Sequence, residues 1–201
     1  MDNMIHSLFP TPLFQTTLRP FTAPELEFIK GLKRRPNVAN SISENSYIFN
    51  SPEMESLLFI CDEAIKKYSE TVISPLSEIS LYITQSWANF TDSAQYHHPH
   101  THQNSVVSGV LYVETDPDDR IYFHRPDVFE ALSFGTKDNN QWNSKSWYFD
   151  VKATTLLLFP SSLTHRVEVK KSPGTRISIS FNTFVKGTLG SNLDLTELYL
   201  K

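Results

Sequence analysis

The sequence after Pro75 is a series of short strand patterns, and this series limits the fold more than any other feature. Each segment alternates polar and apolar residues or is continuously apolar, and turn-forming residues separate it from the next. The expected strands cover residues 79–89, 106–114, 120–124, 147–151, 154–159, 166–170 and 175–185. Because helical patterns precede Pro75 and many strands follow it, we expect an α+β chain, mainly β, with its strands in a sandwich or barrel.

The residues before Pro75 show the periodicity of two helices. Thr22 and Glu25 have the spacing of a capping box, which predicts a helix from there to about residue 34. A second helix is expected from about residue 51, with apolar side chains at steps of three and four: Met54, Leu57, Leu58, Cys61, Ala64, Ile65 and Tyr68. We expect this stripe to pack on a sheet. An early strand is expected over 8–18, and the polar segment 36–50 is expected to be irregular.

Length and composition predict one compact domain. The chain has 201 residues and no linker-like segment, so we expect a single domain over 1–201, helical at about 1–74 and with a β core at about 75–190. The formal net charge of −4 gives no reason to expect a nucleic-acid partner. The single Cys61 excludes an internal disulfide. Without a long apolar run or a secretory signal, we expect a cytoplasmic protein with no membrane partner, and a homodimer remains open.

Two histidines on one extended segment are the strongest indication of chemistry. Side chains repeat with period two in a strand, so His100 and His102 lie on the same side of the chain just before an apolar strand. A third imidazole, His165, follows another apolar strand that breaks at Pro160. Three such nitrogen ligands suit a first-row metal such as iron. On parity alone, His98 with His100 is an equally good pair, although we expect the intervening proline to interrupt the strand.

The segment from Arg176 to Asn182 alternates strictly between polar and apolar residues. Its polar face can be the solvent side of a surface strand, or it can be the polar wall of a binding site, and the pattern favours the two about equally. Arg176 and Ser178 are well suited to bind a carboxylate through forked, charge-assisted hydrogen bonds.

The order of these motifs resembles one enzyme superfamily. H-x-H at residues 100–102, S-G-V-x-Y at 108–112, F-P-x-x-x-x-H at 159–165 and R-x-S-x-S-F-N at 176–182 are similar to the motifs of the iron(II)- and 2-oxoglutarate-dependent oxygenases. The resemblance is narrower to a bacterial and phage subgroup with H-x-H where most members carry H-x-D or H-x-E. It implies a double-stranded β-helix, a jelly-roll or cupin-like core, with flanking N-terminal helices. It also selects the pair at residues 100 and 102 over His98, which then lies at the rim with His97.

The resemblance implies a role for each motif residue. His100, His102 and His165 bind Fe(II), and no other catalytic residue is implied. Arg176 and Ser178 hold the distal carboxylate of 2-oxoglutarate, the cosubstrate. Among the remaining candidates, Tyr112 and Asn89 are placed to contact the cosubstrate, although an aromatic side chain in a core strand is more often there for packing. Supporting contacts around the site are expected from Ser180, Asn182 and Asn104.

The implied function is a 2-oxoglutarate-dependent dioxygenase, an oxidoreductase that hydroxylates a small molecule or a protein side chain and releases succinate and CO2. His102 departs from the superfamily because it replaces a carboxylate ligand. Two alternatives therefore stay open: a three-histidine iron dioxygenase that does not use 2-oxoglutarate, and a non-enzymatic jelly-roll that binds a ligand. The segment 129–146 is long enough to be a lid over the substrate, or it is a surface excursion.

Overall fold

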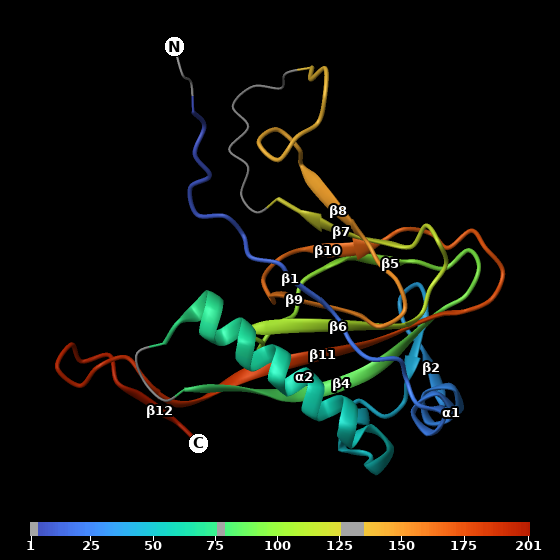
Figure 1. Cartoon of the computed structure of the whole chain (residues 1–201), viewed down its shortest axis with the longest axis horizontal. Coiled ribbons are helices and arrows are strands. Elements are labelled where there is room, and N and C mark those ends of the chain that lie inside the picture. Colours follow the sequence, from blue (N-terminus) through green and yellow to red (C-terminus); the bar gives the residue numbers. More distant parts are fainter. Residues whose placement is uncertain (1–3, 76–78, 126–134) are drawn as a thin grey trace.

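The structure is a computed structural model that describes residues 4–75, 79–125 and 135–201. It is mainly β, as expected, with two antiparallel sheets facing each other (Figure 1). The larger sheet has the order β1 (Phe14–Thr17), β9 (Thr155–Pro160), β6 (Val107–Glu114), β11 (Arg176–Leu189), β4 (Ser80–Thr91), β3 (Ser41–Ser43) and β2 (Arg34–Pro36), and β12 (Leu198–Leu200) pairs with β11. The smaller sheet has the order β5 (His97–His100), β10 (His165–Val167), β7 (Arg120–His124) and β8 (Ser146–Asp150).

Two helices lie beside the larger sheet (Figure 1). They are α1 (Ala23–Gly31) and α2 (Glu55–Tyr68). Short helical turns flank the second one at η1 (Ile48–Asn50), η2 (Pro52–Met54) and η3 (Ser69–Ile73). In the part of the chain that the structure describes, neither helix has the length and apolar character needed to cross a membrane.

Alternation along the central strands sorts the core into two layers. The odd-numbered apolar residues of β11, Ile177, Ile179 and Phe181, pack with the buried face of α2, which includes Cys61 as expected. The second layer lies between the two sheets, with Tyr112 and Phe159 on one side and Ile121 on the other. The polar residues of β11 face this second layer, so they lie in the space between the sheets rather than in solvent.

The N-terminal part of the chain agrees with the sequence prediction at the capping box but differs from it after the first helix. The capping box is confirmed, because the Thr22 hydroxyl accepts from the Glu25 amide and the Glu25 carboxylate accepts from the Thr22 amide. Its helix ends at Gly31, earlier than expected, because the chain turns into the edge strand β2. The segment 36–50 was expected to be irregular, and this was wrong: it contains β3 and η1.

The expected break at Pro99 was also wrong. Strand β5 runs through this proline, from His97 to His100. It lies at the edge of the smaller sheet, where a residue without an amide hydrogen is tolerated on the unpaired side. Of the segment expected to form a lid or a surface excursion, residues 129–134 lie outside the described residues, and the part just before β8 is largely exposed.

The pairing of β6 with β11 requires a glycine at residue 109. Gly109 lies directly opposite Phe181, and a Cβ added there would come within 2.0–2.6 Å of the phenylalanine ring, which is fully buried. We predict that Gly109→Ala lowers the free energy of unfolding by about 1–3 kcal/mol through overpacking, measured by urea denaturation. The control is Gly31→Ala, a helical position with open space around it, which should be neutral or slightly stabilising. Equal midpoints for the two variants would contradict this packing account.

Candidate metal centre

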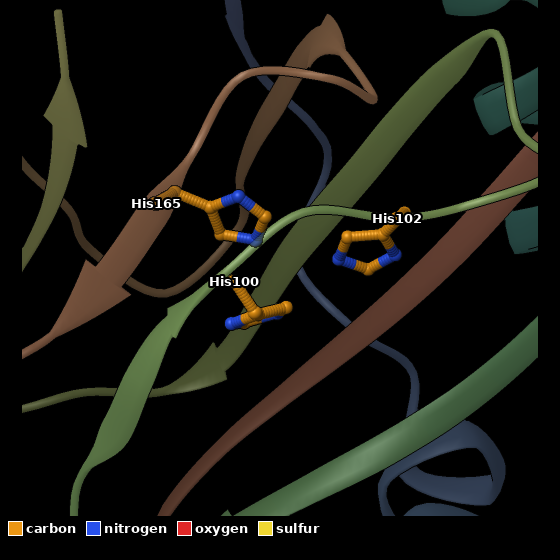
Figure 2. Close-up of side chains that lie close together, drawn as sticks. All are labelled: His100, His102 and His165. Atoms are coloured by element: carbon orange, nitrogen blue, oxygen red, sulfur yellow. The ribbon is translucent and has the colours of Figure 1, made fainter.

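Three imidazoles converge between the two sheets. His100 ends β5, His165 begins β10, and the two are register neighbours in the smaller sheet. His102 follows in the turn after β5, and Figure 2 shows its ring turned toward the other two. One ring nitrogen from each residue lies within 4.8 Å of those of the other two, and the ring centroids are 4.3–5.1 Å apart. The structure therefore brings together the three residues that the sequence selected.

A backbone hydrogen bond joins the two turns that carry the histidines. The amide of His102 donates to the carbonyl oxygen of Ser161 at 2.9 Å, and the amide of Ser161 donates to the carbonyl of Val106 at 3.1 Å. The turn after the first two histidines is thereby attached to the turn before the third. His102 holds its position although it lies outside any strand.

The Nδ1 atom of each histidine faces an oxygen acceptor. His100 Nδ1 is 2.8 Å from the carbonyl oxygen of His98, and His165 Nδ1 is 3.0 Å from that of Leu163. His102 Nδ1 is 2.6 Å from Oδ1 of the Asn182 side chain. An oxygen acceptor favours the tautomer with hydrogen on Nδ1, which leaves each Nε2 lone pair for a metal. Histidines that bind metals are commonly oriented in this way.

Burial keeps these imidazoles neutral. It lowers the pKa of His165 to about 3 and that of His102 to about 4, and it lowers the pKa of His100 as well. Metal ligation requires the neutral ring, so the three side chains are already in the ligating form at neutral pH. Three imidazole donors suit iron, nickel, cobalt or zinc rather than calcium or magnesium, which prefer oxygen. The residues therefore fit an iron(II) ion.

The histidines form one wall of a cavity of about 310 Å³ between the sheets. The opposite wall comes from β4, β6 and β11, and it contains most of the other candidates: Asn89, Tyr112, Arg176, Ser178, Ser180 and Asn182. This volume lies at the small end of the range for ligand sites. Of the described residues that line the cavity, none is an aspartate or a glutamate. Its charge therefore comes from arginine and from whatever the histidines bind.

Arg176 is only 6% exposed and is paired with a carboxylate that the sequence analysis missed. Its Nη1 donates to Oδ1 of Asp119 at 2.6 Å, and both side chains are buried. Asp119 was overlooked because it lies in an acidic turn that reads as surface. The only signal available was indirect, since a buried arginine requires a counterion. A guanidinium has five donors, so this one contact leaves others for a ligand in the cavity.

Asn89 forms hydrogen bonds with several side chains of the wall from β4, β6 and β11, called the polar wall below. Its Nδ2 donates to the Ser180 hydroxyl at 2.9 Å and lies 3.5 Å from that of Ser178, while its Oδ1 accepts from Trp87 Nε1 at 3.2 Å. Tyr112 is buried beside this group, and burial raises the pKa of its phenol. Asn89 and Tyr112 therefore both reach the cavity, as expected for groups that contact a ligand there.

The remaining candidates are placed differently. Asn104 lies in the turn after His102, is exposed, and adopts a left-handed backbone conformation with φ of 55°. It does not line the cavity. His98 lines it, with its ring centroid 5.1 Å from that of His100. His97 also lines it, is half-buried and is hydrogen-bonded to Asn40 at 2.8 Å, so it is fixed in the cavity wall.

Residues 85–182 match the sequence profile of a family described as "Putative 2OG-Fe(II) oxygenase", and they include the three histidines and the arginine of the cavity. This match covers 98 of the 201 residues, and over them the chain is similar to the iron(II)- and 2-oxoglutarate-dependent oxygenases. The match and the three-histidine site together identify an oxidoreductase whose cofactors are iron(II) and 2-oxoglutarate. No functionally curated protein matches its sequence.

Several solved structures share its fold. HygX from Streptomyces hygroscopicus, with nickel, 2-oxoglutarate and hygromycin B bound, is 12% identical, with 86% of this chain and 82% of that chain covered and a TM-score of 0.57. A prolyl-4-hydroxylase from Pseudomonas putida is 12% identical, with 86% and 92% covered and a TM-score of 0.52. A 2OG-Fe(II) oxygenase from Burkholderia pseudomallei is 10% identical, with 78% and 73% covered and a TM-score of 0.55. The double-stranded β-helix expected for this oxygenase is thereby confirmed.

The Arg176–Asp119 pair makes a testable contribution to stability. Asp119→Ala leaves a guanidinium buried without its partner, so we predict that the free energy of unfolding falls by about 3–5 kcal/mol in urea denaturation. Asp118→Ala, at the exposed neighbouring position, is the control and should change little. The double variant Asp119→Ala/Arg176→Met should recover part of the loss, because the uncompensated charge is gone. A single variant as stable as the control would contradict the importance of the pair.

Proposed function

We propose that this oxygenase hydroxylates a small organic molecule or a protein side chain, with His100, His102 and His165 as its iron ligands. The overall reaction is R–H + O2 + 2-oxoglutarate → R–OH + succinate + CO2. The observation that carries the proposal is the convergence of three neutral imidazoles on a cavity whose opposite wall presents Arg176. Iron(II), when bound, supplies the oxygen-activating chemistry, and no further side chain is required as an acid or base.

The polar wall is proposed to bind the cosubstrate. Arg176 offers its remaining donors to the distal carboxylate of 2-oxoglutarate, and the Ser178 hydroxyl lies two residues along the same face of β11. Asn89 keeps the serines of this wall oriented, and Tyr112 closes the cavity beneath them. The buried ion pair with Asp119 holds the guanidinium in one place before the cosubstrate arrives, which reduces the ordering cost of binding.

The apolar part of the cavity is proposed to exclude water. Val110, Ile121 and Phe159 line it from both sheets. A dry site strengthens the hydrogen bonds and charge interactions around the cosubstrate.

The two alternatives predict different cavities. A three-histidine dioxygenase that does not use 2-oxoglutarate has no use for a buried arginine beside a row of serines. A non-enzymatic binding module has no use for three Nε2 atoms that face one point. The family match favours the 2-oxoglutarate-dependent enzyme over both. We further propose that the chain is one domain and that it acts in the cytoplasm. Nucleic acid is not its proposed substrate, because the net charge is −4. A homodimer stays open.

The proposed metal site can be tested by removing its ligands. The purified protein should bind about one iron(II) per chain, and both His102→Ala and His165→Ala should lose most of it, because each removes one of three donors. Metal analysis and 2-oxoglutarate-dependent succinate formation measure the two consequences. His6→Ala, at an exposed position near the N-terminus, is the control. Unchanged iron in both ligand variants would exclude this site, and iron binding without succinate would favour the three-histidine dioxygenase.

The proposed cosubstrate site can be tested at Arg176. Arg176→Lys keeps the charge but loses the fork, and Arg176→Met loses both. A charged hydrogen bond of this kind contributes roughly 1.5–3 kcal/mol, so the Met variant should bind 2-oxoglutarate about ten- to a hundredfold more weakly while iron stays bound. Titration of 2-oxoglutarate into the anaerobic iron(II) protein, followed by its charge-transfer absorption, gives the affinity.

The control for the arginine is Arg120→Met, because Arg120 pairs with Asp150 at the surface and does not line the cavity. Near-UV circular dichroism checks that each variant is folded, since loss of Arg176 leaves Asp119 without its partner. An affinity in the folded Met variant equal to that of the control would show that Arg176 does not bind the cosubstrate.

A further inference from the structure

His102 differs from the other two histidines in the origin of its Nδ1 acceptor. His100 and His165 each face the backbone carbonyl two residues earlier, so their acceptors come with the local chain conformation. His102 instead faces the side chain of Asn182, 80 residues away in β11, at 2.6 Å. It is also the ligand that replaces the carboxylate usual in this superfamily. The residue at the unusual ligand position therefore depends on a side chain from another strand.

A chain of serine hydroxyls holds Asn182 in place. Its Oδ1 accepts a second hydrogen bond from Ser108 at 3.2 Å, and the Ser108 hydroxyl lies 2.8 Å from that of Ser161. The Ser161 hydroxyl in turn donates to Ser105 at 2.7 Å. Ser108 and Ser161 are almost completely buried, where unpaired hydroxyls are costly. The oxygen of Asn182 is thus held by a second donor besides His102.

The same serines belong to the two turns that carry the histidines. Ser105 follows His102 by three residues, and Ser161 precedes His165 by four while its carbonyl accepts from the His102 amide. Trp87 stacks on the His102 ring with a centroid distance of 5.7 Å and an interplanar angle of 23°. The ring is therefore limited in both tilt and rotation, and only its Nε2 edge points to the other two histidines.

We propose that Asn182 is a positioning residue that makes His102 a metal ligand through Nε2, and that the Ser105–Ser161–Ser108 chain fixes the Asn182 oxygen for this purpose. The inference rests on the proposed metal role of the three histidines. Metal-binding histidines usually donate to a carboxylate, a backbone carbonyl or water. A neutral amide in this place orients the ring without adding negative charge. The ligand set then consists of three neutral imidazoles, and Asn182 supports the exchange of carboxylate for histidine.

The inference is tested first by the tautomer of His102 in the metal-free protein. Long-range 1H–15N spectra distinguish hydrogen on Nδ1 from hydrogen on Nε2, and the His102 signals are assigned by their loss in His102→Ala. The wild type should hold the Nδ1–H tautomer, and Asn182→Ala should shift toward the Nε2–H form that free imidazoles favour. Asn182→Asp keeps an oxygen acceptor and should retain Nδ1–H. A wild-type protein with hydrogen on Nε2 would overturn the inference without any variant.

The second test is affinity for Co(II), used as a spectroscopic probe of the site. Asn182→Ala should weaken Co(II) binding about ten- to a hundredfold, the usual cost of losing such a partner, and Asn182→Asp should restore it to within about threefold. Gln85→Ala is the matched control, because Gln85 is the cross-strand neighbour of Asn182 but is exposed and lies outside the cavity. If Asn182→Ala binds Co(II) as tightly as the control, the inference about Asn182 is wrong, while the proposed metal role of the histidines stands. Equal binding by the wild type and His102→Ala would instead overturn the proposed metal function.

Discussion

The strict alternation of β11 is the constraint on which the other features of this oxygenase depend. Because strand side chains alternate between faces, one set of its residues must fill the core beneath α2 while the other set faces the smaller sheet. The apolar set holds the sheet in place. The polar set supplies the arginine, the two serines and the asparagine that surround the cavity. A shift of one residue in register would bury the guanidinium under the helix, so folding in the correct register and forming the site are one event.

The smaller sheet brings two of the three proposed metal ligands together through its pairing. β5 and β10 are hydrogen-bonded neighbours, and this pairing places His165 beside His100 although 65 positions separate them in the chain. The third proposed ligand, His102, lies just beyond the strand. Its position depends on tertiary hydrogen bonds to Ser161 and Asn182 rather than on sheet geometry. The centre thus combines two ligands set by the sheet and one set by side-chain and turn contacts.

Much of this arrangement could be predicted from the sequence, because it follows from local patterns. Period-two alternation identified most of the strands, and the order of the histidine and arginine motifs identified the residues of the cavity. What escaped prediction is set by tertiary context. Strands β2 and β3 are only three residues long and carry few strand formers, so no pattern indicates them. The pairing of Arg176 with Asp119 joins residues 57 positions apart, and neither neighbourhood indicates the other.

The three Nδ1 acceptors differ in whether a substitution can remove them. For His100 and His165 the acceptor is a main-chain carbonyl, which every residue type supplies, so no substitution at residues 98 or 163 deletes it. For His102 the acceptor is encoded by a single codon in β11. A single substitution of the acceptor residue can therefore remove the Nδ1 contact of His102 but not those of His100 and His165. In an evolving lineage, the orientation of this one imidazole is the part of the centre most readily lost or retuned by a single base change outside the histidines themselves.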